Sequence, residues 1–123
     1  MNKKEYHFSF DEYASIDELN SRDADLLKAA RAMTNNAYAP YSKFFVGAVA
    51  QLSNGKQIAG TNQENASYPV GLCAERALLA AAATQYPGIP IESMAISYRN
   101  TKKVGHYPLS PCGMCRQALQ EFE

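Results

Sequence analysis

The sequence predicts one layered α/β domain, in which helices pack on a small β-sheet. Helical segments alternate with apolar, strand-like segments along the chain, which is typical of this fold class. The pair Asn54-Gly55 separates two apolar segments and is a strong hairpin signal, because both residues tolerate positive φ. The length of 123 residues, with 46% hydrophobic and 20% charged residues, is typical of a single folded domain.

The first helix is predicted between an N-cap at Asp17 or Ser21 and the helix-breaking Pro40. Its buried face consists of apolar residues spaced three, four or seven positions apart, namely Leu19, Leu26, Ala30, Met33 and Ala37. Before this helix, residues 1–15 alternate aromatic with polar side chains. That alternation indicates an N-terminal arm or an edge strand.

The remaining elements follow from apolar periodicity and turn residues. Strands are predicted at Phe44–Leu52 and residues 57–60, on either side of the hairpin turn, and at residues 91–98. A helix is predicted at residues 74–86, where alanine on several faces indicates close packing against the sheet. A last helix is predicted at residues 116–122. The whole chain, 1–123, is therefore expected to form a single domain.

Composition excludes several classes of function. Twelve basic and twelve acidic residues cancel, which disfavours nucleic acid as a partner. The longest apolar run, residues 77–83, is far shorter than the roughly 20 residues of a membrane span. No apolar segment follows the basic N-terminus, so a secretory signal is not predicted. We expect a cytoplasmic protein whose partners are small molecules or copies of itself.

The three cysteines are the most informative residues. Cys112 and Cys115 form a C-x-x-C pair, which in a reducing compartment favours metal binding or redox chemistry over a disulfide scaffold. Two thiolates at i and i+3 in a first helical turn can bind one ion, and Cys73, at the start of another predicted helix, can supply a third ligand. Three protein ligands leave one tetrahedral position open, which is typical of a catalytic zinc.

Charged residues next to these cysteines extend the candidate site. Glu75 follows Cys73 by two positions in an otherwise apolar helix, and a carboxylate beside the open zinc position suits general acid–base catalysis. A surface glutamate at a helix N-terminus is the alternative. Arg76 and Arg116 directly follow the ligand segments, and their guanidinium groups would offset the excess negative charge of three thiolates. Solvent-facing arginines are the alternative for both.

Four segments resemble the small, homotetrameric, three-cysteine type of cytidine deaminase, and the resemblance extends from about residue 23 to residue 123. The segments are Ala-Pro-Tyr-Ser-Lys-Phe-x-Val-Gly-Ala at 39–48, Asn-x-Glu-Asn-Ala at 62–66, Cys-Ala-Glu-Arg at 73–76 and Ser-Pro-Cys-Gly-Met-Cys-Arg-Gln at 110–117. Four motifs in this order are much more specific than C-x-x-C alone.

The resemblance implies a layered α-β-α sandwich with a mixed sheet, from which C-terminal strands of the family are missing in this chain. It also implies a homotetramer. One zinc ion per chain would be bound by Cys73, Cys112 and Cys115, and Glu75 would be the proton shuttle. The implied reaction is the hydrolytic deamination of cytidine or deoxycytidine to uridine or deoxyuridine and ammonia, as in pyrimidine salvage.

The resemblance also implies substrate contacts. Asn62 and Glu64 would hold the ribose hydroxyls, Phe44 would pack on the pyrimidine, and the backbone of Ala74 would meet the base edge. From the residues alone, Asn62 and Glu64 are equally suited to forming a turn, and Phe44 to packing in the core.

Three alternatives remain open at this point. The first is a related deaminase, of the blasticidin type or acting on a free base, although Asn62 and Glu64 favour a ribonucleoside. The second is a structural zinc site that takes its fourth ligand from His7 or His106. The third is a thiol-redox protein that uses Cys112 and Cys115, which would leave Cys73 and Glu75 unexplained.

Overall fold

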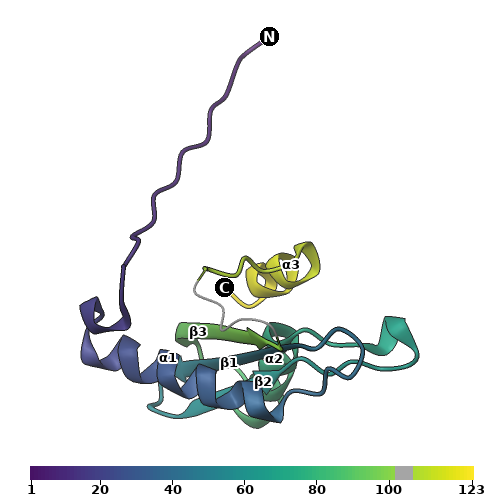
Figure 1. Cartoon of the computed structure of the whole chain (residues 1–123). Helices are drawn as coiled ribbons and strands as arrows, with labels where there is room; N and C mark the ends of the chain where they lie inside the picture. The colour runs from purple at the N-terminus through teal and green to yellow at the C-terminus, as the bar shows by residue number, and fades with distance from the viewer. Residues whose placement is uncertain (102–106) are drawn as a thin grey trace.

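A computed structural model of the chain describes residues 1–101 and 107–123 (Figure 1). Its longer elements are α1 (Ser21–Met33), β1 (Phe44–Leu52), β2 (Gln57–Thr61), α2 (Ala74–Gln85), β3 (Ile91–Asn100) and α3 (Gly113–Glu121). Three short 3₁₀ helices, η1, η2 and η3, lie at Ile16–Glu18, Thr34–Asn36 and Tyr68–Val70. The elements predicted from the sequence are therefore present and in the predicted order.

The strands form a sheet of order β2-β1-β3, with β1 in the centre. Both pairings are antiparallel, with Ala48 opposite Gly60 on β2 and Ile96 on β3. Within the described residues the predicted mixed sheet is therefore wrong. The connection through α2 does make β2 and β3 run in the same direction, but β1 lies between them, so they share no parallel ladder.

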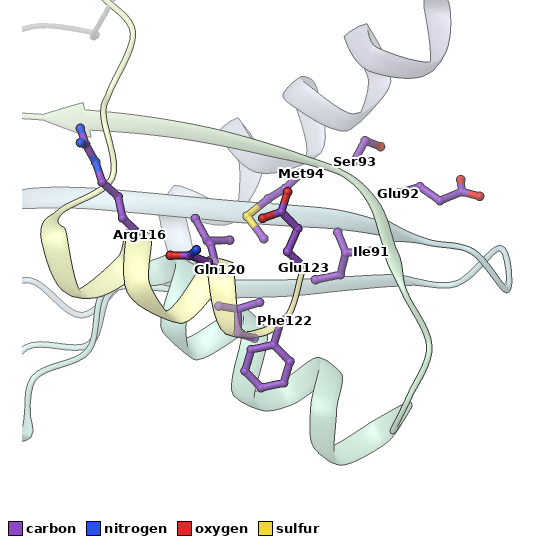
Figure 2. A pocket seen from close by; sticks show the side chains of 10 residues that line it. Ile91, Glu92, Ser93, Met94, Arg116, Gln120, Phe122 and Glu123 are labelled. Carbon is purple, nitrogen blue, oxygen red and sulfur yellow. The ribbon is translucent and has the colours of Figure 1, made fainter. Parts of the chain in front are cut away.

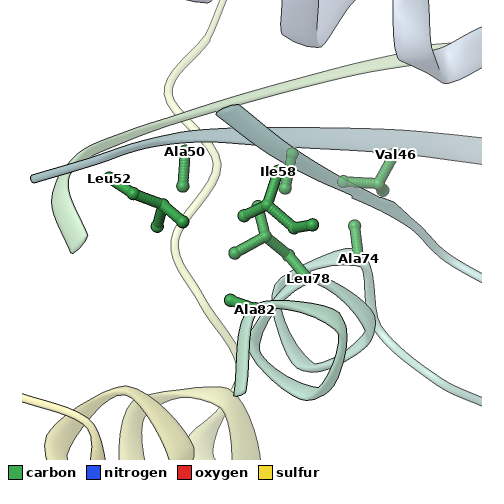
Figure 3. Packing of buried hydrophobic residues seen from close by; sticks show 8 residues of the cluster. Val46, Ala50, Leu52, Ile58, Ala74, Leu78 and Ala82 are labelled. Atoms are coloured by element: carbon green, nitrogen blue, oxygen red, sulfur yellow. The ribbon is translucent and has the colours of Figure 1, made fainter. Parts of the chain in front are cut away.

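Helices cover both faces of the sheet, which confirms the layered α-β-α arrangement. On one face, Leu26 and Ala30 of α1 pack with Val49. On the other face, α2 lies under β1 and β2, and Figure 3 shows Leu78 and Ala82 pointing toward the sheet. α3 packs beside α2 rather than on the sheet centre (Figure 1). Because α2 and α3 are neighbours, their N-terminal turns can share one site.

Two glycines allow the helices to approach the sheet closely. A Cβ on Gly60 would lie 2.4 Å from the backbone nitrogen of Leu78 and 2.5 Å from the carbonyl oxygen of Ala74. A Cβ on Gly47 would lie 2.3 Å from the carbonyl oxygen of Ala30. Since real Cβ contacts are never this short, any side chain at these positions would push α2 or α1 away from the sheet.

The first helix is shorter than predicted. Asn20, rather than Asp17 or Ser21, is the N-cap, and its side chain accepts a hydrogen bond from the N–H of Asp23 at 2.9 Å. At the other end α1 gives way to η2, so Ala37 lies outside the regular helix, as Leu19 does at the start. Leu26 and Ala30 are buried as predicted.

The N-terminal segment extends away from the rest of the chain (Figure 1). Residues 1–13 form neither helix nor strand, and their aromatic side chains Tyr6, Phe8 and Phe10 are exposed. The aromatic alternation therefore marks an arm, and the edge strand offered as its alternative is not formed. None of the described helices is long and apolar enough to cross a membrane.

Candidate metal centre and substrate site

The three cysteine sulfurs converge at one place. The Sγ atoms of Cys73 and Cys112 are 3.8 Å apart, those of Cys112 and Cys115 are 3.2 Å apart, and all three lie within 4.8 Å of one another. A tetrahedral ion with Zn–S bonds of about 2.3 Å holds its sulfur ligands roughly 3.8 Å apart. All three cysteines are free of disulfides. The spacing and softness of these donors fit zinc, as the sequence predicts.

The N-termini of two helices hold these sulfurs. Cys73 is the N-cap of α2, and Cys112 is the N-cap of α3. The sulfur of Cys112 accepts a hydrogen bond from the N–H of Cys115 at 3.4 Å, so α3 begins at Gly113, three residues earlier than predicted. Cysteine is an unusual cap, so apolar periodicity predicts the helix only from residue 116, whereas the C-x-x-C spacing indicates its first turn. Both helix dipoles direct positive charge at the cluster and favour thiolates there.

The two sulfurs of the C-x-x-C pair differ in their surroundings. The N–H of Cys115 lowers the pKa of the exposed Cys112 thiol, and the thiol of Cys115 adds to this effect. Burial raises the pKa of Cys115, and the neighbouring thiols and the charge of Glu75 raise it further. Cys112 therefore ionises more readily than Cys115 when no metal is bound.

Neither histidine joins the cluster in the described part of the chain. His7 lies on the exposed arm, 3.5 Å from the carboxylate of Glu5, and is not among the grouped ligands. His106 lies outside the described residues. Among the described residues, the ligand set therefore consists of three cysteines. A thiol-redox site would need only Cys112 and Cys115, so that alternative does not explain why Cys73 lies with them.

Glu75 is buried in the helical turn that follows Cys73, and its charge reaches the thiol of Cys115. This turn is the first of α2, and the side chain is only 6% exposed. The alternative of a solvent-facing glutamate at a helix N-terminus is therefore wrong. A carboxylate is rarely buried unless it is bonded, paired or used in chemistry.

The two arginines differ in position. Arg76 is half-buried and donates to the carbonyl of Gly71 at 3.3 Å. Burial acts to lower the pKa of Arg76, but hydrogen bonds and charge attraction with Cys73 and Cys115 outweigh it, so the pKa is raised. Arg116 is exposed, and its guanidinium donates to the carbonyl of Pro111 at 3.3 Å. Its backbone N–H donates to the carbonyl of Cys112 at 2.9 Å, but no described side-chain hydrogen bond of Arg116 reaches a cysteine sulfur. Arg76 alone therefore has described contacts with the sulfurs.

Asn62 joins the end of β2 to the start of β1. Its Oδ1 accepts from the N–H of Val46 and its Nδ2 donates to the carbonyl of Phe44, both at 2.8 Å. One further N–H and one lone pair of the carboxamide remain for another partner. The side chain is thus held rigidly in one orientation while keeping hydrogen-bonding capacity.

Glu64 holds the loop that precedes β1. Its Oε1 accepts from the N–H groups of Tyr41 and Ser42, at 3.0 and 3.1 Å. A hydrogen bond from the Ser42 hydroxyl lowers the pKa of the Glu64 carboxyl, and the two N–H groups lower it further. The carboxylate therefore stays ionised and fixed in place. Its partner Ser42 belongs to the 39–48 motif but was not predicted as a site residue.

Phe44 and Ala74 lie on the same side of the sheet. Ala74 is fully buried at the start of α2, and Phe44, half-buried, packs against the cluster that contains Ala74. The Phe44 ring stacks on Tyr98 of β3, with ring centroids 5.1 Å apart and an interplanar angle of 27°. Sequence reasoning missed Tyr98, although its place on the same face of the neighbouring strand could have indicated it.

Residues 20–123 match the family model described as the cytidine and deoxycytidylate deaminase zinc-binding region. The chain belongs to this deaminase family. Its three-cysteine cluster is the family's zinc-binding region in this molecule. The resemblance of the four sequence motifs to cytidine deaminases is thereby confirmed.

Individual members of the deaminase family are similar to this chain in sequence and structure. A cytidine deaminase of Mycoplasma pneumoniae is 43% identical over 90 residues, which cover 73% of this chain and 64% of that protein. The crystal structure of cytidine deaminase from Mycobacterium tuberculosis matches with a TM-score of 0.71 and 36% identity, covering 84% of this chain and 79% of that one. The enzyme from Burkholderia pseudomallei matches with a TM-score of 0.70, 39% identity and coverages of 85% and 77%.

A separate groove of about 510 Å³ lies between α3 and β3 (Figure 2). Its apolar lining comes from Leu79, Ile91, Met94, Leu119 and Phe122. Of the predicted site residues only Arg116 borders it, so this groove is not the deaminase site.

Proposed function

We propose that this chain carries the catalytic centre of a cytidine deaminase, which hydrolyses cytidine or deoxycytidine to uridine or deoxyuridine and ammonia. The observation that carries the proposal is the buried carboxylate of Glu75 in the same helical turn that presents a zinc-binding sulfur. A structural zinc site needs no such carboxylate, whereas a hydrolytic site needs a group that moves protons.

Glu75 would move the protons of the reaction. When zinc is bound by Cys73, Cys112 and Cys115, it supplies Lewis acidity that makes a water more acidic. The carboxylate of Glu75 accepts a proton from the attacking water and passes it to ring N3 while the water oxygen bonds to C4. The same carboxylate then takes the remaining proton from the hydroxyl on C4 and delivers it to the amino group. The C4–N bond breaks as the C4 carbonyl forms, and ammonia leaves. Burial of Glu75 excludes competing water from these transfers.

Arg76 would adjust the charge of the zinc centre. Three thiolates leave a dipositive ion with one negative charge in excess, which weakens its effect on water. Arg76 interacts with two of the three cysteines, and a guanidinium there offsets that excess. Arg116 would contribute by fixing the loop at Pro111 that leads into α3.

Asn62 and Glu64 would hold the ribose. Both side chains are already fixed by backbone groups of the segment around β1, so they present polar atoms without further loss of conformational freedom. The remaining N–H of Asn62 donates to a ribose oxygen, and the free lone pairs of Glu64 accept from a hydroxyl. The turn-forming and ribose-binding roles are compatible in this arrangement.

Phe44 and the backbone of Ala74 would hold the base. The Phe44 ring offers an aromatic face to the pyrimidine, and Ala74, between Cys73 and Glu75, offers its backbone to the base edge. A free base would forgo the contacts of Asn62 and Glu64, so a nucleoside is favoured over cytosine. A related aminopyrimidine nucleoside, as in blasticidin-type deaminases, remains the alternative substrate.

The test is ammonia release from cytidine, deoxycytidine and cytosine, with zinc content measured on the same sample. We expect about one zinc per chain and turnover of one or both nucleosides but not of cytosine. The matched control is Cys112→Ser, which should lose zinc and turnover together. Full zinc binding with no turnover of any of the three compounds would support a structural zinc site instead.

We also propose that the protein is cytoplasmic and that it works as a homo-oligomer. Its resemblance to the small deaminases indicates a tetramer. The alanine-rich stretch at residues 80–83 supports close packing of α2 at a contact, since Ala80 is exposed. Sedimentation at micromolar concentration tests this assembly. A monomer with full nucleoside turnover would contradict it.

A further inference from the structure

We propose that Tyr98 of β3 is a positioning residue, which holds the Phe44 ring in the orientation that packs on the pyrimidine. This inference rests on the proposed function, because it needs a nucleoside at the Phe44 ring. It assigns Tyr98 an effect on substrate affinity rather than a part in the chemical step.

The sheet register places the two rings together. Val46 is directly opposite Tyr98, and Phe44 is opposite Asn100, so Tyr98 is the diagonal neighbour of Phe44 on the same face. The ring centroids are 5.1 Å apart with an interplanar angle of 27°, a stacked arrangement. Stacked aromatic pairs stabilise one another beyond the burial of their surface.

The backbone of Phe44 is fixed, but these contacts do not orient its ring. Its carbonyl accepts from Asn62 at 2.8 Å, and its N–H donates to the hydroxyl of Ser42 at 3.1 Å. Both contacts fix the main chain and leave rotation of the side chain to be restricted by packing. Because Tyr98 stacks on the ring, it supplies that restriction.

The position of Tyr98 in the sheet leaves the other side of Phe44 for a ligand. The strand order is β2-β1-β3, so Tyr98 supports Phe44 from the β3 side. Asn62 and Glu64, the proposed ribose contacts, follow β2 on the opposite side of β1. A nucleoside held there approaches Phe44 from the side away from Tyr98. Tyr98 is therefore placed to orient the ring without occupying the base position.

The experiment compares steady-state kinetics of the zinc-loaded full chain with those of three variants, using cytidine. Tyr98→Leu keeps apolar bulk but removes the stacked ring, and Tyr98→Phe keeps the ring but removes the hydroxyl. Met94→Ala is the matched control, since Met94 packs against the same core from the same strand but away from Phe44. Zinc content and thermal melting of each variant show that it is folded.

We expect Tyr98→Leu to raise KM for cytidine roughly two- to ten-fold with kcat nearly unchanged. The reason is that contact with the Phe44 ring stabilises the bound substrate and the transition state equally, so its loss weakens binding without slowing the chemical step. Tyr98→Phe and Met94→Ala should keep KM within about two-fold of the wild type. The Kd for uridine, measured by calorimetry, should rise in Tyr98→Leu by the same factor as KM.

Three results would overturn the proposal. An unchanged KM in Tyr98→Leu would show that the stack does not matter to the substrate. A lower KM would show that Tyr98 obstructs the base position. An equal rise in Met94→Ala would show a general packing effect. If the wild type neither turns over cytidine nor binds uridine, the proposed function itself fails, which is distinguishable from all three.

Discussion

At the scale of single residues, Glu75 is notable for combining burial with a place next to the metal ligands. Its side chain is 6% exposed at the N-terminal turn of α2, and its charge acts on the thiol of Cys115. The helix dipole stabilises the carboxylate at this end of α2. A buried carboxylate beside an open metal position is suited to repeated proton transfer.

Glu75→Gln tests this role. General acid–base catalysis contributes roughly 10² to 10⁴-fold, and in the proposed mechanism Glu75 serves several steps, so the variant should lose turnover of cytidine by about 10⁴-fold. Zinc content and thermal melting should stay close to the wild type, because glutamine keeps the size of the side chain. Near-normal turnover in a zinc-loaded Glu75→Gln protein would exclude Glu75 as the proton shuttle.

Glu64 should make the stability of the loop before β1 depend on pH. Its folded-state pKa is lowered from 4.5, first by the Ser42 hydroxyl, so its contribution is present above about pH 4.5 and is lost as the pH falls through the folded pKa. Glu64→Gln should lower the free energy of unfolding by about 1 kcal/mol at pH 7 and by less at pH 3. Urea unfolding at both pH values measures this difference.

The control for this comparison is Glu5→Gln on the exposed arm, which should leave stability unchanged at both pH values, since exposed ion pairs contribute little. If Glu64→Gln were equally destabilising at pH 3 and pH 7, the effect would come from packing and not from the charge of the carboxylate.

At the scale of elements, the position of α2 depends on Gly60. A Cβ there would be 2.4 Å from the Leu78 nitrogen and 2.5 Å from the Ala74 oxygen, both of them backbone atoms that cannot move independently. Because Cys73 and Glu75 lie at the start of α2, a shift of this helix moves a metal ligand and the proposed proton shuttle together.

Gly60→Ala should therefore destabilise the fold by about 1 to 3 kcal/mol and weaken zinc binding. Chemical unfolding and zinc titration measure the two effects. The matched control is Gly113→Ala at the start of α3, where a Cβ meets nothing within 4 Å, so stability and zinc binding should be retained. A fully stable Gly60→Ala protein would show that β2 and α2 can separate without cost.

At the scale of the whole molecule, the zinc site connects two parts of unequal burial. α2 contributes several residues to the core under β1 and β2, whereas Cys115 is the buried residue of α3. Met114 and Phe122 of the α3 region are exposed. A metal bound by Cys73, Cys112 and Cys115 thus joins a firmly packed helix to a weakly packed one.

Removal of zinc with a chelator should therefore release α3 first. Amide hydrogen exchange in α3 should become faster by an order of magnitude or more, whereas exchange in β1 should change little, because β1 is protected by its two neighbours and both helical layers. Uniform acceleration throughout the chain would instead show that zinc supports the entire fold.

Local sequence patterns predict the order of elements, the hairpin at Asn54-Gly55 and the four motifs that form the candidate site. These depend on local chemistry: apolar periodicity, turn residues and ligand spacing are properties of short segments. They were enough to bring Cys73, Cys112 and Cys115 into one predicted site. The C-x-x-C spacing indicates the first turn of α3, whereas apolar periodicity predicts that helix only from residue 116, because capping by a cysteine sulfur is an uncommon local signal.

Strand neighbours and side-chain burial, in contrast, are visible only in the folded chain. The mixed sheet was implied by the family resemblance, but both described pairings of β1 are antiparallel, and strand order is a property of the whole sheet. The burial of Glu75, the anchoring of Asn62 to Phe44 and the Tyr98 stack likewise join segments far apart in the sequence. Such contacts depend on packing over long sequence separations, which periodicity within one segment does not encode.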